Sequence, residues 1–247
     1  MGHPPSPHLD VVAAPASGVL AALPAELGTL RSGAARTARV AGQTLHETRL
    51  EDGSCVLAAV SGVGKVAAAA AAAALVAEGI GRLLVVGTCG GLRGADEVGD
   101  LVHATVAVQW DLAVREGREI AADPALSRAW AAVAASGPAA FLTADRPAIR
   151  AVERLRRARA ARRFTDGTVV ADMETAAAAA VAERSGVPWA ALRVVSDRRQ
   201  RWIDLIRPTS RRNASFAEGF RKHAARPSET VLELLERLSE ARASSAK

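Results

Sequence analysis

The sequence predicts an α/β fold, a single domain around a mostly parallel or mixed sheet. Short runs of β-branched and other apolar residues alternate along the chain with Ala-rich stretches of helical character, and this alternation is typical of α/β proteins. The chain has 247 residues, of which 49% are hydrophobic and 23% charged. A chain of this length buries well over half of its unfolded surface, so it needs no disulfides or metal to hold a core.

The expected strands are apolar runs, several of them continuous enough to be buried on both faces of a sheet. They are Val11–Ala14, Ser54–Val60, Leu83–Val86, Asp100–Gln109, Ala139–Thr143, Val169–Met173 and Trp189–Val195. The expected helices are Lys65–Glu78, Thr175–Arg184 and Ser228–Glu240. Glycines end the first two helices, and the third carries leucines at helical spacing. We expect one domain over residues 9–241, with disordered ends at 1–8 and 242–247.

Cysteine content and hydropathy exclude several classes of protein. The chain has two cysteines, Cys55 and Cys89. They cannot form a disulfide framework, and each is predicted to be a small buried hydrophobe in a reducing compartment. The stretch from Val66 to Val76 is too short and too weakly apolar to cross a bilayer about 30 Å thick. The first residues also lack a basic segment followed by an apolar one. We therefore expect a cytoplasmic protein with no membrane partner.

The balance of charge invites comparison with nucleic-acid-binding proteins. Lys and Arg number 32 against 26 Asp and Glu, for a formal net charge of +6 and a sequence pI of about 10.5. The arginines are concentrated in residues 146–163 and 198–226. We favour a solvated arginine-rich face over a nucleic-acid partner, with a polyanion-binding surface as the alternative.

A glycine-rich segment, Gly87-Thr-Cys-Gly-Gly91, directly follows one of the expected strands. Three glycines allow backbone N–H groups to approach a ligand closely, and Thr88 offers a hydroxyl; a tight strand-to-loop turn is the alternative. Ser61-Gly-Val-Gly-Lys65 has the wrong spacing for a phosphate loop and is better explained as a strand-to-helix turn. Ligands of open α/β sheets bind beyond the carboxyl ends of the strands, where both segments lie.

Carboxylates follow two further strands. Glu174 lies at the start of an expected helix, where the helix dipole helps to keep it ionised, and an ionised carboxylate suits the vicinal hydroxyls of a ribose. Asp172, just before it, is a candidate N-cap. Asp197 ends the next apolar run; a partly buried Asp there could have a raised pKa and act as a proton donor. Helix capping is the alternative for Asp197.

Taken together, the ordered segments SGVGK, VGTCGGL, VGDLV, LTAD, VVADMET and RVVSD resemble the purine and uridine nucleoside phosphorylase superfamily. The resemblance covers roughly Val11 to Leu238 and is greatest to the nucleosidases that cleave methylthioadenosine and S-adenosylhomocysteine. It implies a three-layer sandwich with a central mixed β-sheet flanked by helices, assembled as a homodimer or larger homo-oligomer. It also implies scission of the N-glycosidic bond of a small-molecule purine nucleoside, with no metal and no organic cofactor.

The resemblance also assigns roles to individual residues. Asp197, oriented by Ser196, would protonate or hydrogen-bond purine N7 as the base departs, and Arg193 would support the acid or the nucleophile. The substrate-binding residues all lie in the motifs above. They are Glu174 at the ribose hydroxyls, Met173 against the sugar, Asp172 beside them, Thr88 and Gly90 in the loop near the nucleophile, and Asp145 beside the base.

The chain departs from the family where the nucleophile is handled. Nucleosidases follow the first strand with Met-Glu-Glu-Glu, whose last Glu activates water; here no carboxylate occurs until Glu26, which together with Asp111 is a poor candidate. Phosphorylases place Arg after the first strand and before the glycine loop, where this chain has no Arg before Arg31 and has Val85. Pro147 also replaces an aromatic residue that often stacks on the base.

Three functions stay open. The first is a nucleosidase of low activity that uses water, because the usual base is missing. The second is a phosphorylase with a rebuilt phosphate site. The third is a catalytically weakened member that binds a nucleoside or an RNA.

Overall fold

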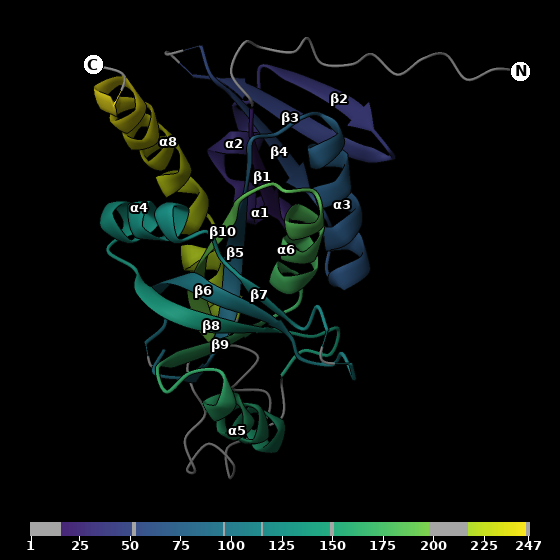
Figure 1. Ribbon diagram of the computed structural model, residues 1–247, viewed down its shortest axis with the longest axis vertical. Helices are drawn as coiled ribbons and strands as arrows, with labels where there is room; N and C mark the ends of the chain where they lie inside the picture. The colour runs from purple at the N-terminus through teal and green to yellow at the C-terminus, as the bar shows by residue number, and fades with distance from the viewer. Residues whose placement is uncertain are drawn as a thin grey trace, which may run out of the picture.

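The computed structural model describes residues 16–50, 53–95, 97–114, 116–148, 151–197 and 217–245. Its strands form one mixed sheet (Figure 1). They are β1 Ser17–Ala21, β2 Arg36–Val40, β3 Gln43–Arg49, β4 Cys55–Val60, β5 Arg82–Arg93, β6 Leu101–Gln109, β7 Glu119–Ala121, β8 Gly137–Thr143, β9 Thr168–Asp172 and β10 Trp189–Asp197. The α-helices are α1 Pro24–Leu27, α2 Thr29–Ser32, α3 Lys65–Ala77, α4 Pro124–Ala134, α5 Ala151–Ala160, α6 Thr175–Arg184 and α8 Arg226–Ser245.

The long strand β5 organises the sheet. Its first half pairs in parallel with both β1 and β10, and its last residues pair antiparallel with β9. Because β10 also pairs with β6, β6 with β8 and β8 with β9, these five strands close into a ring. Strands β1, β4, β3 and β2 extend from β5 as an open wing.

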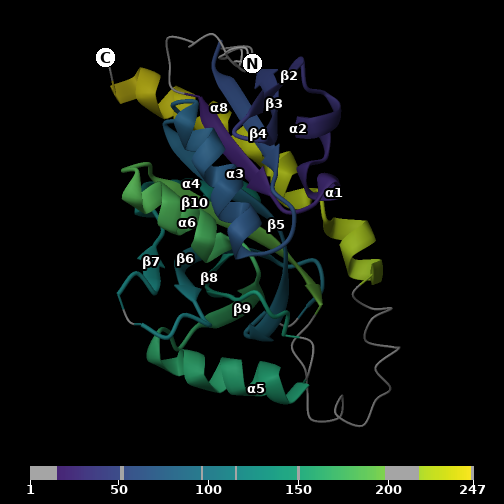
Figure 2. The same ribbon diagram turned by 90° about the vertical axis from the view of Figure 1, so that its right-hand side faces the viewer.

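Two apolar layers cover the faces of the sheet. Helices α3 and α6 pack against each other on one face, and Ala-rich surfaces let them lie close to the strands. On the other face, α1, α2, α4 and α8 enclose a core built around Trp130, Leu30 and Leu234 (Figures 1 and 2). Side chains that alternate along β1 serve the two layers, since Leu20 faces the first and Val19 the second. The expected three-layer α/β sandwich is confirmed.

Helix α5 lies apart from these layers, at the end of the molecule below β9 (Figure 2). A small apolar cluster that includes Leu92, Leu142, Val169 and Ala161 joins it to the ring of strands. The inward face of α5 also carries two arginines, Arg154 and Arg157, which are 5% and 3% exposed. The arginine-rich segment is therefore not a uniformly solvated face.

Most of the predicted elements are confirmed: β4, β6, β8, β9, β10, α3 and α6 each begin and end within a few residues of the expected positions. Among the described helices, none combines the length and the apolar character that a membrane span requires.

Four expectations about the elements need correction or lie outside the described residues. The predicted strand Val11–Ala14 and the predicted disordered segment 1–8 lie outside; the first described strand is Ser17–Ala21. The glycine-rich segment is not a loop, because β5 continues through it to Arg93. Helix α8 runs to Ser245, so residues 242–245 are helical rather than disordered.

Candidate active site

The candidate site lies where β1 and β5 separate. Their pairing ends at Leu20 and Val85, after which β5 continues beside β10 while the chain after β1 turns into α1. This turn carries Glu26 to Thr88, in the middle of β5 and just beyond the last residue that pairs with β1. The separation of neighbouring strands leaves room for polar side chains at this edge, as at the crevices where open α/β sheets bind ligands.

Glu26 is buried, with 1% of its surface exposed, and both carboxylate oxygens are anchored. Oε2 accepts hydrogen bonds from the backbone N–H groups of Ala22 and Leu23 at 3.1 and 3.0 Å. Oε1 accepts from the backbone N–H and the hydroxyl of Thr88 at 2.8 and 2.9 Å. The position of this carboxylate is therefore fixed from both the α1 turn and the β5 strand.

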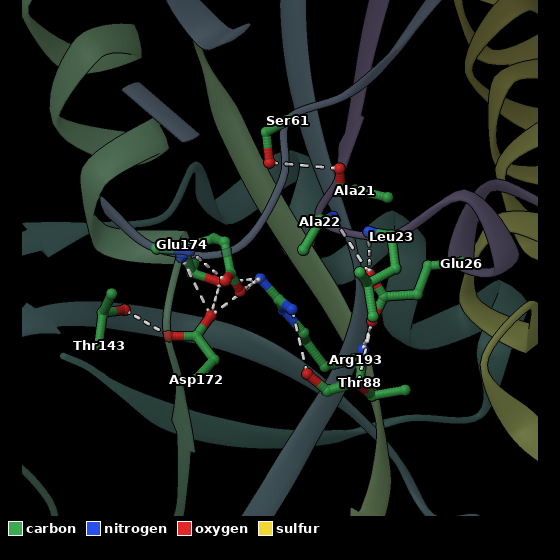
Figure 3. Close-up of polar contacts among 12 residues, drawn as sticks. Ala21, Ala22, Leu23, Glu26, Ser61, Thr88, Thr143, Asp172, Glu174 and Arg193 are labelled. Atoms are coloured by element: carbon green, nitrogen blue, oxygen red, sulfur yellow. Dashed lines mark hydrogen bonds and ion pairs between the residues drawn. The ribbon is translucent and has the colours of Figure 1, made fainter. Parts of the chain in front are cut away.

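Arg193 on β10 lies between Glu26 on one side and two further carboxylates, Asp172 and Glu174, on the other (Figure 3). Its Nη1 donates to the Thr88 carbonyl at 3.0 Å, and its Nη2 lies 3.0 Å from Asp172 Oδ2 and 3.4 Å from Glu174 Oε2. Burial lowers the pKa of Arg193, but the three carboxylates outweigh burial and hold this pKa above its ordinary value. The guanidinium thus stays charged while fully enclosed.

Glycine is required at position 87 by this arrangement. A methyl group there would lie 2.8 Å from Glu26 Oε1 and 2.9 Å from Arg193 Nη1, and the residue has a φ of +141°. Any side chain would displace the two charged groups, so the first glycine of the segment makes room for the site itself.

Asp172 supports the site from inside. Its side chain has no exposed surface; Oδ1 accepts from the Thr143 hydroxyl, and Oδ2 accepts from the Thr175 backbone N–H at 3.0 Å besides pairing with Arg193. Asp172 thus contacts the first residue of α6, a helix whose N-cap is Glu174, and it positions Arg193. Its expected part in substrate binding stays a prediction.

Glu174 lies at the rim of the same cluster. Its Oε1 accepts from the Gly64 backbone N–H at 3.0 Å, which ties it to the turn between β4 and α3. Burial raises the pKa of Glu174, and neither Arg193 nor the Gly64 amide reverses that shift. Met173, beside Glu174, is half-buried.

Asp197 is the last residue of β10 and lies further along that strand than Arg193. The register pairs Asp197 with Gly90, and a methyl group at Gly90 would lie 3.0 Å from Asp197 Oδ1 and 3.4 Å from both terminal nitrogens of Arg154. Arg154 forms an ion pair with Asp197 Oδ2. Ser196, expected to orient Asp197, instead donates to the Cys89 carbonyl at 3.2 Å and so joins β10 to β5. The side chain that holds Asp197 in place is Arg154.

Asp145 belongs to a neighbouring polar cluster. Its Oδ1 accepts from the Lys65 backbone N–H at 2.9 Å, and its own N–H donates to Asp111 Oδ2 at 3.0 Å. Burial raises the pKa of Asp111, but hydrogen bonds from Lys65 and the Asp145 amide outweigh burial and hold it below the ordinary value. Asp111 is therefore an ion-pair partner of Lys65 rather than a base. The cluster fixes the turn whose Gly64 contacts Glu174.

The structure thus brings Thr88, Arg193, Asp172 and Glu174 together and adds Glu26 to them. On the sequence alone, Glu26 is only a poor candidate for the base. Because β1 ends at Ala21, Glu26 lies five residues beyond the end of this strand. Arg154 was also missed. The spacing of Arg154, Arg157 and Ala161 along one helical face was the signal that could have shown which arginines point inward.

Comparison with known proteins identifies the family. A family model described as the phosphorylase superfamily matches residues 16–237. The chain belongs to this superfamily. Within it the candidate site occupies the matched region, since Glu26, Thr88, Glu174 and Asp197 all fall inside it. A search of curated proteins finds no match.

Solved structures similar to this phosphorylase-superfamily chain share its fold over nearly their whole length. A 5'-methylthioadenosine/S-adenosylhomocysteine nucleosidase from Helicobacter pylori, bound to butyl-thio-DADMe-Immucillin-A, has 20% identity and a TM-score of 0.78, covering 91% of this chain and 99% of that one. A futalosine hydrolase mutant from Helicobacter pylori has 19% identity and a TM-score of 0.77, covering 91% and 100%. An S-adenosylhomocysteine nucleosidase from Streptococcus pyogenes, in complex with 5-methylthiotubericidin, has 21% identity and a TM-score of 0.77, covering 92% and 98%. These likenesses establish the fold.

Cys89, between Thr88 and Gly90, offers a test of how tightly this part of β5 is packed. The residue is 3% exposed, and burial raises the pKa of its thiol far above the ordinary value. Because the thiolate is the reactive form, we expect negligible alkylation of Cys89 by iodoacetamide in the native protein between pH 7 and 9. Alkylation should be complete in urea, as quantified by mass spectrometry of tryptic peptides. Rapid labelling of native Cys89 would show that β5 is open here.

Proposed function

We propose that this chain hydrolyses the N-glycosidic bond of a purine nucleoside. Water attached to Glu26 attacks C1′ of the sugar, Glu174 binds the ribose hydroxyls, and Asp197 assists departure of the base. The single observation that carries the proposal is the buried Glu26 carboxylate, which is hydrogen-bonded to Thr88, the residue whose carbonyl accepts from Arg193. It supplies the base whose position in related nucleosidases follows the first strand.

The charge around Arg193 favours water over phosphate as the nucleophile. Asp172 and Glu174 already pair with the guanidinium, and Glu26 adds a third carboxylate. A phosphate dianion would meet net negative charge in a poorly solvated place, where like charges repel strongly. A neutral water meets no such repulsion. It can donate one hydrogen to Glu26 while its oxygen faces the sugar.

The chemistry balances with these groups alone. The C1′–N9 bond breaks with its electron pair passing to the base, which takes a proton at N7 from the carboxylic acid form of Asp197 and leaves an oxocarbenium-like sugar; solvent later returns a proton to Asp197. Water forms the new C1′–O bond and its proton passes to Glu26. Such a transition state needs little nucleophilic push, so the fixed carboxylates act chiefly by position and charge. General acid or base assistance of this kind typically contributes about 10²- to 10⁴-fold.

Two alternatives have lost support. A nucleosidase of low activity was expected because no carboxylate was found to activate water, and the proposed role of Glu26 supplies one. A family member that binds without catalysis was expected for the same missing carboxylate, so the proposal weakens that alternative too. A phosphorylase stays the second candidate only through family membership, and the nature of the sugar product distinguishes it.

The test is to incubate the purified protein with purine nucleosides, with and without phosphate, and to quantify free base and sugar by chromatography. We expect base release at equal rates in both buffers, with ribose as the product. Ribose 1-phosphate would contradict the choice of water.

Glu26→Gln tests the base. The amide keeps the size of the side chain but cannot take a proton, so we expect turnover to fall by about 10²-fold or more. The exposed Glu236→Gln is the matched control and should behave as wild type. Because the amide also places an NH₂ against donors, the melting temperature must be measured. Near-wild-type turnover in a folded Glu26→Gln protein would contradict the role of Glu26.

Glu174 makes the rate depend on pH. Its pKa is raised by burial, so as pH falls it becomes protonated earlier than an ordinary Glu, and the charged acceptor for the ribose is lost. We expect kcat/KM on ribosides to fall on the acid side with an apparent pKa above the usual value for Glu, about 4.3. Glu174→Gln should be slow throughout and lack this limb, while the exposed Glu183→Gln on the same helix should retain it. An unchanged acid limb in Glu174→Gln would assign it to another group.

A further inference from the structure

Helix α5 and the 3₁₀ turn that follows it, η1 Ala161–Arg163, carry a strongly basic outer surface. Residues 146–167 contain eight arginines and two acidic residues, Glu153 and Asp166. Arg154 and Arg157 are buried, and Arg157 forms an ion pair with Glu153. The one acidic residue of α5 is therefore engaged by a buried arginine and does not neutralise the outer surface of the helix.

Four exposed arginines lie on this outer surface: Arg156, Arg159, Arg162 and Arg163. Arg156, Arg159 and Arg163 recur at the spacing of one helical face. At the helical rise of about 1.5 Å per residue they span about 10 Å. None of the four guanidinium groups pairs with a carboxylate in the part of the chain that the structure describes. Their charge is therefore available to an anionic ligand.

Two partly buried aromatic rings, those of Trp110 and Phe164, lie beside these arginines. Cζ of Arg163 lies 4.6 Å from the centre of the Phe164 ring and 5.8 Å from that of Trp110, and Cζ of Arg118 lies 5.9 Å from the Trp110 ring. Unpaired bases of nucleic acids stack on aromatic rings and on the planes of guanidinium groups. Charge alone would also suit an acidic protein segment, but the neighbouring flat groups favour a nucleic acid strand.

We infer that the outer surface of α5 and η1 binds single-stranded nucleic acid. Phosphates contact Arg156, Arg159 and Arg162, and bases stack against Arg163 and Trp110. The sequence alone favours a solvated face here; the structure adds the unpaired arginines on one helical face and the aromatic rings beside them. The surface lies at the end of the molecule (Figure 2). The inference uses no residue of the candidate active site, so it does not depend on the proposed function.

The experiment measures binding of fluorescent oligouridylate and oligothymidylate, each of about 20 nucleotides, to the full-length protein by fluorescence anisotropy. If about three phosphates are neutralised, the dissociation constant should rise by about 15-fold or more between 50 and 200 mM salt. Binding of either strand with this salt dependence supports the inference, and a preference between the strands identifies RNA or DNA. Absence of binding to both strands, or binding that does not respond to salt, would overturn it.

A charge-reversed double variant, Arg156→Glu with Arg159→Glu, tests whether this surface is responsible. Both positions are exposed, so the fold should be kept, and the dissociation constant should rise by about 10-fold or more with a shallower salt dependence. The matched control is Arg36→Glu with Arg39→Glu, two exposed arginines on β2 at the opposite end of the molecule (Figure 1). It changes the net charge equally and should bind as wild type does. Equal losses in the two double variants would overturn the assignment to α5.

An abasic strand of the same length separates nucleic acid from polyanions in general. It carries the same phosphates but no bases, so it retains the attraction to the arginines and loses the stacking. We expect it to bind at least about fivefold more weakly than oligothymidylate, because stacking of bases on aromatic side chains contributes to single-strand binding. Equal binding of the two strands would overturn the inference of a nucleic-acid surface, because an acidic protein segment or any other polyanion would then fit as well.

Discussion

A buried guanidinium surrounded by carboxylates is the constraint on which the site depends. Arg193 is 1% exposed, and it pairs with Asp172 and Glu174 while donating to the backbone at Thr88. Removing one partner from a buried ion pair commonly costs about 3–5 kcal/mol, because the remaining charge is left uncompensated. The cluster therefore holds β5, β9, β10 and the start of α6 in one arrangement. Arg193 pairs directly with Glu174, and Glu26 is joined to it through Thr88, which contacts both.

The two ends of the site are built differently. At the end where we propose that the sugar binds, carboxylates outnumber the one arginine, which would suit a neutral nucleophile and a sugar that gains positive charge. At the end where we propose that the base binds, Arg154 forms an ion pair with Asp197, so a positive charge would lie near a leaving group that gains negative charge. This opposition of charge matches the separation of charge along a breaking glycosidic bond.

The buried strands and the Ala-rich helices could be predicted from the sequence because continuous apolar runs and helical periodicity depend on local composition. The first described strand could not. It begins Ser17-Gly18, which are weak strand formers, and Gly18 is needed because a side chain there would meet Ile80 at 2.6 Å. That requirement is set by a segment far along the chain. The distance from β1 to the carboxylate that follows it, Glu26, could therefore not be counted from the sequence.

The roles of Glu174 and Asp197 were suggested by motif, whereas the contacts of Arg154 depend on how α5 packs across the end of the ring of strands. The central claim is that Glu26, Glu174 and Asp197 form one site around a nucleoside. A crystal structure with a hydrolysis-resistant purine nucleoside tests it most directly. The account predicts N7 within hydrogen-bond distance of Asp197, ribose hydroxyls at Glu174, and C1′ facing Glu26 and Thr88. A nucleoside bound elsewhere, or bound with its base against Glu26, would contradict it.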